Sequence, residues 1–163
     1  MSTPYITSRF YRAPELLLAN TKYDSKIDMF CNIETLILIN NLILIFTNEI
    51  TILAIGCIIG ELFTLRPLFP GKSEGMQLFE YIATLGKPTK KYFQQFNLEK
   101  DVLKMLTDLK ENKPYDLALI INSTNIYDKK DVDLAVDLLK HLLHWEAKSR
   151  YSAEEALKHE FLQ

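Results

Sequence analysis

The sequence has few cysteines and glycines and no excess of either charge. Its two cysteines, Cys31 and Cys57, lack the spacing of a metal site and are too few for a disulfide scaffold, which indicates a reducing, intracellular compartment. The 19 basic and 21 acidic residues give a net charge of −2. Without a basic excess, the chain is not expected to bind nucleic acid or an anionic membrane. Residues 1–12 are polar and contain no signal-peptide core.

Hydrophobic residues, which make up 48% of the chain, recur mostly at helical spacing. Helices are expected at residues 15–19, 26–30 with a continuation at 54–65, 73–85, after Asn97, 131–144 and from Ser152 onward. Residues 110–130 are expected to be mostly loop. No segment predicts a strand, so the predicted fold class is mainly α.

Each expected helix has a face assigned to the core by its spacing. The inward residues are Met76, Phe79, Ile82 and Leu85; then Leu98, Val102, Leu106 and Leu109; then Val132, Ala135, Val136, Leu139, Leu142 and Leu143; and finally Ala156 and Leu157. Ser152 and Glu155 also match the capping box that begins a helix.

The most specific local pattern is SRFYRAPE at residues 8–15. Ala-Pro-Glu closes the activation segment of protein kinases. With an Arg-aromatic-Tyr-Arg run before it, the pattern resembles the CMGC group, which contains the cyclin-dependent, mitogen-activated and glycogen synthase kinases. Residues 5–9 resemble the glycogen synthase kinase type, whereas Thr3-Pro4-Tyr5 matches the Thr-x-Tyr of mitogen-activated kinases, so the subfamily stays open.

Further motifs of this group follow in the same order. They are Asp28-Met29-Phe30 joined to Ile55-Gly56-Cys57, PLFPG at 67–71, LGKPT at 85–89 and RYSAEEAL at 150–157. The resemblance covers nearly all of residues 1–163. It implies a partial kinase domain, the C-terminal lobe from the end of the activation segment through the last helix, with the N-lobe absent.

The resemblance assigns structural roles to three residues. Glu15 and Arg150 match a buried ion pair, for which the planar guanidinium is suited because it meets a carboxylate through two hydrogen bonds. The alternative is two solvated surface charges. Asp28 matches a helix aspartate that accepts backbone N–H groups from the catalytic loop.

Tyr5 matches the activation-loop tyrosine that is phosphorylated in this group, and Arg9 and Arg12 match the arginines that bind its phosphate. A phosphotyrosine adds about −1.5 to −2 charges and three acceptor oxygens. The two arginines would then fix the loop beside the substrate pocket. The alternative is a loop tyrosine with two solvated arginines.

The residues that perform phosphoryl transfer in kinases are missing from these 163 residues. We find no Gly-x-Gly, no His-Arg-Asp and no Asp-Phe-Gly, although kinases need a Gly-rich loop, a catalytic aspartate and a Mg²⁺-binding aspartate. ATP and Mg²⁺ are therefore implied by the family only. The chain alone is expected to bind neither and to be inactive, with no catalytic, cofactor-binding or metal-ligating residue. His141 and His144 lack acidic or cysteine partners at a metal spacing, which favours packing or surface roles.

Residues 31–53 interrupt the expected helix as an apolar insertion rich in Ile, Leu, Asn and Thr. One hypothesis is a retained intron whose removal would leave Asp-Met-Phe-Ser-Ile-Gly-Cys, the family pattern with Phe for Trp; sequencing the transcript tests it. The rival is a membrane anchor through 31–65, but the most apolar run, 36–46, is shorter than the roughly 20 residues of a spanning helix.

By family, the chain is part of a Ser/Thr protein kinase that transfers the ATP γ-phosphate to proteins. Its expected partners are protein substrates or docking proteins that bind through residues 73–131, and its expected location is cytoplasmic or nuclear. The alternative functions are a non-catalytic interaction module and a membrane-anchored fragment.

Overall fold

The computed structural model of the chain describes residues 9–18, 49–110 and 113–163. All regular structure within these ranges is helical, with no strand, which confirms the predicted mainly-α class of a partial kinase C-terminal lobe. The α-helices are α1 (Pro14–Leu18), α4 (Glu49–Thr64), α5 (Glu74–Leu85), α6 (Lys90–Gln94), α7 (Lys100–Asp108), α8 (Leu117–Ile121), α9 (Lys129–Leu142) and α10 (Ala153–Leu157). Short 3₁₀ turns are η1 (Arg9–Tyr11), η2 (Asn122–Thr124), η3 (Ala147–Ser149) and η4 (Glu160–Leu162).

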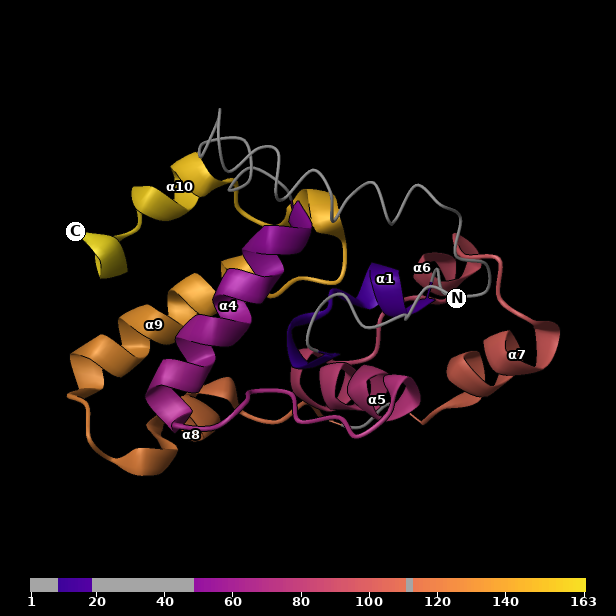
Figure 1. Cartoon of the computed structure of the whole chain (residues 1–163), viewed down its shortest axis with the longest axis horizontal. Coiled ribbons are helices and arrows are strands. Elements are labelled where there is room, and N and C mark those ends of the chain that lie inside the picture. Colours follow the sequence, from indigo (N-terminus) through magenta and orange to yellow (C-terminus); the bar gives the residue numbers. More distant parts are fainter. Residues whose placement is uncertain (1–8, 19–48, 111–112) are drawn as a thin grey trace, which may run out of the picture.

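Helix α4 packs along α9 in one half of the molecule, and α5 and α7 lie in the other half (Figure 1). Glycine allows the close approach of the α4 backbone to its neighbours. A Cβ added at Gly56 would lie 2.8 Å from Leu143 Cδ2, and one added at Gly60 would lie 2.7 Å from Leu68 Cδ2. A larger residue at either position would therefore push these elements apart.

Local side chains and a glycine define the ends of α5 and α10, and the capping box of α10 is the one that the sequence predicts. Ser73 Oγ accepts the Met76 N–H at the start of α5, and Gly86 ends that helix with a φ of 82°. Ser152 and Glu155 form the complete capping box of α10. Local side-chain chemistry therefore sets these boundaries.

The prediction of the buried face of α5 was wrong for two of its four residues, Met76 and Phe79. Met76 and Phe79 are 48% and 45% exposed, and Ile82 and Leu85 are only partly buried. The buried residues are instead Gln77, Leu78, Tyr81 and Thr84. Three of these carry polar groups, so a search for apolar periodicity selected the neighbouring face.

The buried polar groups of α5 have partners that sequence spacing does not reveal. Gln77 Oε1 accepts the Gly71 N–H at 3.0 Å, and the Tyr81 hydroxyl donates to the Arg12 carbonyl at 2.9 Å. Burial of a polar group costs little when its hydrogen bonds are made. These contacts tie α5 to the turn before it and to the segment that enters α1.

Other predictions need smaller corrections. In α7, Leu106 is buried but Val102 is 39% exposed, and in α10 Ala156 is buried while Leu157 is 64% exposed. Residues 110–130 contain α8 and η2, and α6 was also missed. Helices of five residues are too short to show a clear period. The predicted helix at 131–144 is confirmed as α9, with all six of its expected core residues buried.

Helix α4 begins inside the stretch that we expected to be an insertion. Its first residues belong to 31–53 rather than following them, and Ile52 and Leu53 are 2% and 0% exposed. Ile52 packs with Leu138, Leu142 and Ala156. The last part of the expected insertion is therefore built into the core, which corrects the predicted helix start at 54; residues 31–48 lie outside the described residues.

Helix α4 also bears on the membrane hypothesis. It has 16 residues, and in the part of the chain that the structure describes no helix combines the length and apolar character needed to cross a bilayer.

Candidate functional site

The two residues expected to pair across the chain lie in direct contact. Arg150 follows η3, and its Nη1 and Nη2 each donate to one carboxylate oxygen of Glu15 in α1, both at 2.8 Å. Arg150 Nε also donates to the His144 carbonyl at 2.8 Å, and Nη2 donates to the Trp145 carbonyl at 3.3 Å. This paired, two-bond geometry joins residues 135 positions apart in the sequence.

Burial makes this ion pair a structural element. The Arg150 side chain is 0% exposed and the Glu15 side chain is 21% exposed. A guanidinium removed from water needs most of its donors satisfied, and here carboxylate and carbonyl oxygens surround it. The pair holds the segment before α10 against α1.

Arg12 lies just before α1 and forms a second ion pair. Its Nη1 donates to Glu74 Oε1 at 2.9 Å, with side-chain exposures of 9% for Arg12 and 46% for Glu74. The main chain of Arg12 is held by the Tyr81 hydroxyl. The guanidinium therefore projects from a fixed backbone toward a carboxylate that is half in water.

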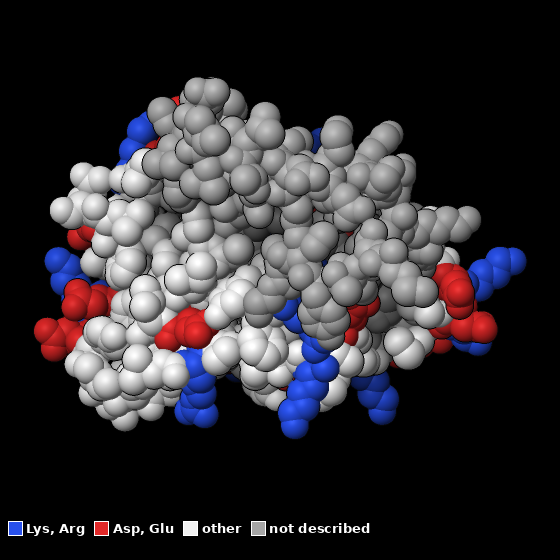
Figure 2. All heavy atoms as spheres, in the orientation of Figure 1, with Lys and Arg blue, Asp and Glu red and all other residues white. Residues whose placement is uncertain are grey.

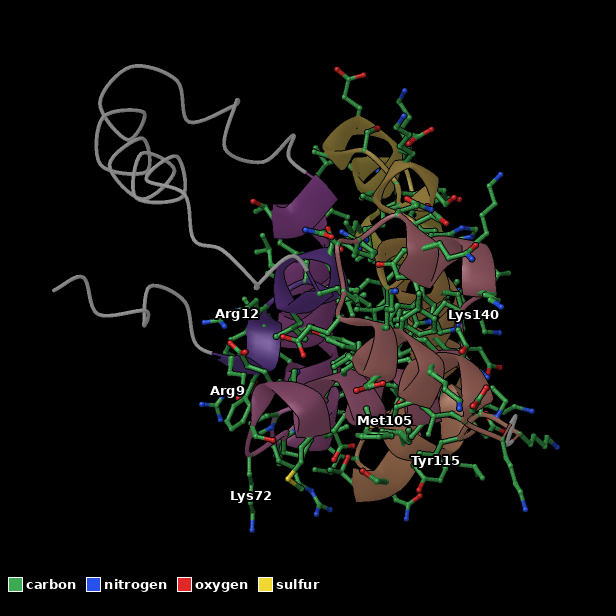
Figure 3. All side chains as sticks on the ribbon, turned by 90° about the vertical axis from the view of Figure 1, so that its right-hand side faces the viewer. Arg9, Arg12, Lys72, Met105, Tyr115 and Lys140 are labelled. Carbon is green, nitrogen blue, oxygen red and sulfur yellow. The ribbon has the colours of Figure 1, made fainter. Side chains whose placement is uncertain are left out.

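Arg9 lies in η1 on the same side of the molecule as Arg12 and Lys72 (Figure 3). Its Nη1 donates to the Lys72 carbonyl at 2.6 Å in an exposed contact. We call Arg9, Arg12 and Lys72 the cationic cluster. It consists of three positive side chains, and Glu74 is the carboxylate that pairs with one of them.

The turn that contains Gly71 and Lys72 is held in place by contacts with Gln77. A Cβ added at Gly71 would lie 2.4 Å from the Gln77 backbone, so only glycine fits there. Gln77, which is 0% exposed, bonds this glycine and also donates from Nε2 to the Phe10 carbonyl at 3.4 Å. Sequence analysis missed Gln77, and the only signal for it was its place beside a turn rich in Pro and Gly.

The remaining expected site residues, Tyr5 and Asp28, lie outside the described residues. The structure therefore brings together Glu15 with Arg150, and Arg9 with the turn that carries Lys72. It does not test the contact of Tyr5 with the arginines. Among residues 9–18, 49–110 and 113–163, no group of three or more His, Cys, Asp or Glu side chains could hold a metal ion.

The titratable groups in the core are held in their neutral forms. Burial raises the pKa of the Cys57 thiol to about 12, and burial likewise raises the pKa of the Tyr81 hydroxyl. At the edge of α4, a hydrogen bond of 2.5 Å to Glu61 Oε2, aided by burial, raises the pKa of the Tyr11 hydroxyl. These shifts favour packing roles, because a reactive thiol or phenol needs a lowered pKa.

The histidines of the C-terminal helices have packing and surface roles. His141 stacks on Tyr151 with ring centroids 4.1 Å apart. His159 Nε2 lies 3.0 Å from Asp137 Oδ2, and His144 Nδ1 accepts the Glu146 N–H.

Comparisons with known proteins point to one group of enzymes. No protein-family model matches the chain. Over 160 residues it is 31% identical to the sporulation-specific mitogen-activated protein kinase SMK1 of Saccharomyces cerevisiae, covering 98% of this chain and 34% of that protein. It is 32% identical over 161 residues to the mouse serine/threonine-protein kinase ICK, covering 99% and 20%. It is also 34% identical over 160 residues to extracellular signal-regulated kinase 2 of Dictyostelium discoideum, covering 98% and 35%.

The all-helical lobe and these similarities define a protein kinase segment. The chain is homologous to kinases of the CMGC group over nearly all of its length, and it corresponds to a fragment of such a kinase. It spans between a fifth and about a third of the length of the curated relatives it matches.

Proposed function

We propose that this chain is the C-terminal lobe portion of a Ser/Thr protein kinase, that it carries the activation-segment side of the substrate site, and that by itself it transfers no phosphate. The observation that supports this most directly is the Glu15–Arg150 ion pair, which ties the end of the SRFYRAPE segment to the last helices of the lobe. As a family member it would act in the cytoplasm or nucleus on protein substrates, using ATP and Mg²⁺ bound by parts that these 163 residues do not contain.

The proposed inactivity follows from the chemistry of phosphoryl transfer. Catalysis of this reaction consists mainly of positioning the nucleotide and neutralising its charge. The cationic cluster could bind one phosphate, but it offers no carboxylate pair for Mg²⁺ and no Gly-rich loop. Isothermal titration with MgATP should show no binding to the chain alone, and a radiolabel assay with a general protein substrate should show no transfer. Nucleotide binding at micromolar concentration would contradict this part of the proposal.

The proposed regulatory device is phosphorylation of Tyr5, with Arg9 and Arg12 binding the phosphate. Arg12 is already paired with Glu74, so the phosphate has to compete with that carboxylate. With about −1.5 to −2 charges against −1, it would bind both arginines more strongly. Arg12 would then exchange the partly exposed Glu74 for the phosphate, and the phosphate would join Tyr5 to the segment before α1.

This competition allows a specific test. The chain is phosphorylated on Tyr5 by co-expression with a tyrosine kinase, and the rate of dephosphorylation by a phosphatase is measured. Bound phosphate should be protected, so Arg12→Gln should speed dephosphorylation several-fold and Glu74→Gln should slow it. Arg66→Gln, at an exposed arginine in the turn after α4, is the matched control. Equal rates in all four chains would exclude a role for Arg12 in phosphate binding.

A second candidate function is a non-catalytic docking module, and the unexpected exposed face of α5 favours it. Met76 and Phe79 are half exposed there, and Met105 of α7 and Tyr115 are 51% and 63% exposed within the same 73–131 region. Exposed Met and aromatic side chains are common where proteins bind partners. Phe79→Asp should abolish binding of a protein partner through this region while leaving the thermal midpoint of the chain unchanged. Unchanged partner binding by Phe79→Asp would exclude this face.

A further inference from the structure

A cavity of about 370 Å³ lies where the end of α5, the start of α8 and the end of α9 meet. Leu85, Leu117, Leu143 and Trp145 form apolar parts of its wall. Its volume is near the lower end of the range of small-molecule sites, which runs from about 300 to 1,000 Å³. The cavity therefore suits a small ligand with an apolar body.

Hydrogen bonds hold the wall of this cavity in place. The Tyr115 N–H donates to the Ala83 carbonyl at 2.7 Å, which ties the segment before α8 to α5. Trp145 Nε1 donates to the Gly86 carbonyl at 2.9 Å, which ties the segment after α9 to the end of α5. A site that is formed before its ligand arrives loses less conformational freedom on binding.

Thr84 places a polar group in the wall of the cavity. It is 8% exposed, and within the described residues its hydroxyl makes no hydrogen bond. Thr64, which is 6% exposed, shows the usual situation, because its hydroxyl donates to the Arg66 carbonyl at 2.6 Å. Buried hydroxyls normally have a partner, so a ligand in the cavity can supply the one that Thr84 lacks.

Two donors stand at the mouth of the cavity. Lys140 and His144 line it from the end of α9, and both are exposed; Lys140 lies in the same half of the view in Figure 3 as Tyr115. Among the described residues, the Lys140 ammonium makes no hydrogen bond or ion pair. His144 Nδ1 accepts the Glu146 N–H, so the ring carries a proton on Nε2. Both side chains can donate to an anionic group of a ligand.

The negative groups near the mouth are already engaged. Asp116 lines the cavity, but its Oδ1 accepts the Ala118 N–H at 2.9 Å as the cap of α8. The carbonyls of His144 and Trp145, just past the end of α9, accept hydrogen bonds from Arg150. On the face shown in Figure 2, basic and acidic side chains are interspersed. Selection of a ligand therefore depends on individual side chains and not on a broad field of one sign.

We propose that this cavity binds a small aromatic carboxylate. The ring lies against Trp145 and the leucines of the wall, because aromatic pairs gain energy beyond the area that they bury. A hydroxyl on the ring bonds Thr84, and the carboxylate accepts hydrogen bonds from Lys140 and His144. The site is additional to the proposed kinase role, and it shares no residue with the cationic cluster.

A fluorescence titration tests the proposal directly. Trp145 is the one tryptophan of the chain and lines the cavity, so its emission reports on occupancy. The probe 4-hydroxyphenylacetate should give a saturable change. Phenylacetate lacks the hydroxyl that would bond Thr84, and tyramine has an amine in place of the carboxylate. Each should bind at least about five-fold more weakly, because each loses a hydrogen bond to the site.

Two variants assign these contacts to particular residues. Lys140→Gln should weaken 4-hydroxyphenylacetate about five-fold and leave tyramine unchanged, because only the carboxylate uses the ammonium. Thr84→Val, which keeps the shape of the side chain, should abolish the preference for 4-hydroxyphenylacetate over phenylacetate. Lys129→Gln, at an exposed lysine at the start of α9, is the matched control and should bind as the wild type does.

The preference between probes keeps the test independent of stability, because a variant that lowers the thermal midpoint affects all three probes alike. The proposal is overturned if the wild type gives no saturable change at millimolar 4-hydroxyphenylacetate, or if tyramine binds equally well. It is also overturned if Lys129→Gln weakens binding as much as Lys140→Gln, or if Thr84→Val keeps the wild-type preference.

Discussion

Two arginine–glutamate pairs of similar length have opposite surroundings in this molecule. Arg150 and Glu15 meet through two hydrogen bonds of 2.8 Å, and the arginine side chain is fully buried. Arg12 Nη1 donates to Glu74 Oε1 at 2.9 Å, and the glutamate is 46% exposed. The distances are nearly equal, so distance does not separate the two pairs.

The two pairs differ in whether water can reach the charged groups when one partner is removed. Water can reach Glu74, so Arg12 can exchange that carboxylate for another anion at small cost. Water cannot reach Arg150, so loss of Glu15 leaves a buried charge without its main partner. The buried pair is therefore suited to hold the lobe together, and the half-exposed pair is suited to respond to a phosphate.

The largest expected effect comes from breaking the buried pair. Glu15→Ala should lower the free energy of unfolding by roughly 3–5 kcal/mol, because Arg150 would remain buried and uncompensated. Urea unfolding followed by the fluorescence of Trp145, which is 8% exposed, measures this. Glu74→Ala is the comparison variant, and an equal loss in both would remove the distinction between the pairs.

A double variant of Glu15 and Arg150 tests whether the two side chains of the buried pair stabilise the fold as one unit. If Arg150 and Glu15 act as one unit, Glu15→Ala combined with Arg150→Ala should cost clearly less than the sum of the two single changes. Alkylation of Cys57 in a Cys31→Ser background gives a second readout, because a buried thiol with a pKa of about 12 reacts only when the core opens. Strict additivity would show that the two side chains act independently.

An intermediate loss of stability is expected when Gln77, which holds the turn at Gly71, is replaced. Gln77→Leu removes the acceptor of the buried Gly71 N–H, and leaving such a donor unsatisfied costs about 1–3 kcal/mol. Faster amide exchange at Gly71 and a lower thermal midpoint are the expected results. Met76→Leu, at the exposed neighbour, should leave both unchanged, and a similar shift in that control would point to helix α5 as a whole.

A small loss is expected at the half-exposed pair. Glu74→Gln should lower the free energy of unfolding by less than about 1 kcal/mol, and high salt should reduce the difference further. Unfolding in low salt and in 1 M NaCl measures it. A loss of several kcal/mol that persists in salt would show that Arg12 and Glu74 form a structural pair like the buried one.

The contact between His159 and Asp137 lies at the surface, and its contribution to stability should depend on pH. The hydrogen bond from His159, aided by nearby cationic groups, lowers the pKa of Asp137 below its ordinary value of 3.8. A carboxylate with a depressed pKa stabilises the folded state above its unfolded value, and that contribution is lost as pH falls through the folded value. The small difference in thermal midpoint between the wild type and Asp137→Asn should therefore be present at pH 6 and vanish in acid; a difference that grows in acid would contradict the sign.

The sequence predicted the elements whose determinants are local. The Ser152–Glu155 box, which the sequence predicted, marks the start of α10 through bonds that span a few residues. The six inward residues of the expected helix at 131–144 were found because all six are apolar and follow one period. The order of the motifs also predicted a kinase fold and the pairing of Glu15 with Arg150.

Periodicity failed where burial depends on a distant partner. Gln77 and Tyr81 are buried because of Gly71 and the Arg12 carbonyl, and Phe79 was placed inward only because it is apolar. The start of α4 shows the same limit. Ile52 and Leu53 are 2% and 0% exposed although they lie in the stretch that was expected to be an insertion.

The amino-acid sequence by itself determined the resemblance to kinases, the helical class and the pairing of Glu15 with Arg150, because motifs and caps depend on nearby residues and their order. Only the tertiary structure decided that Arg150 is fully buried, that Arg12 faces an exposed carboxylate and that Thr84 lines a cavity. Exposure depends on which elements pack on which, and packing joins residues that are far apart in the chain.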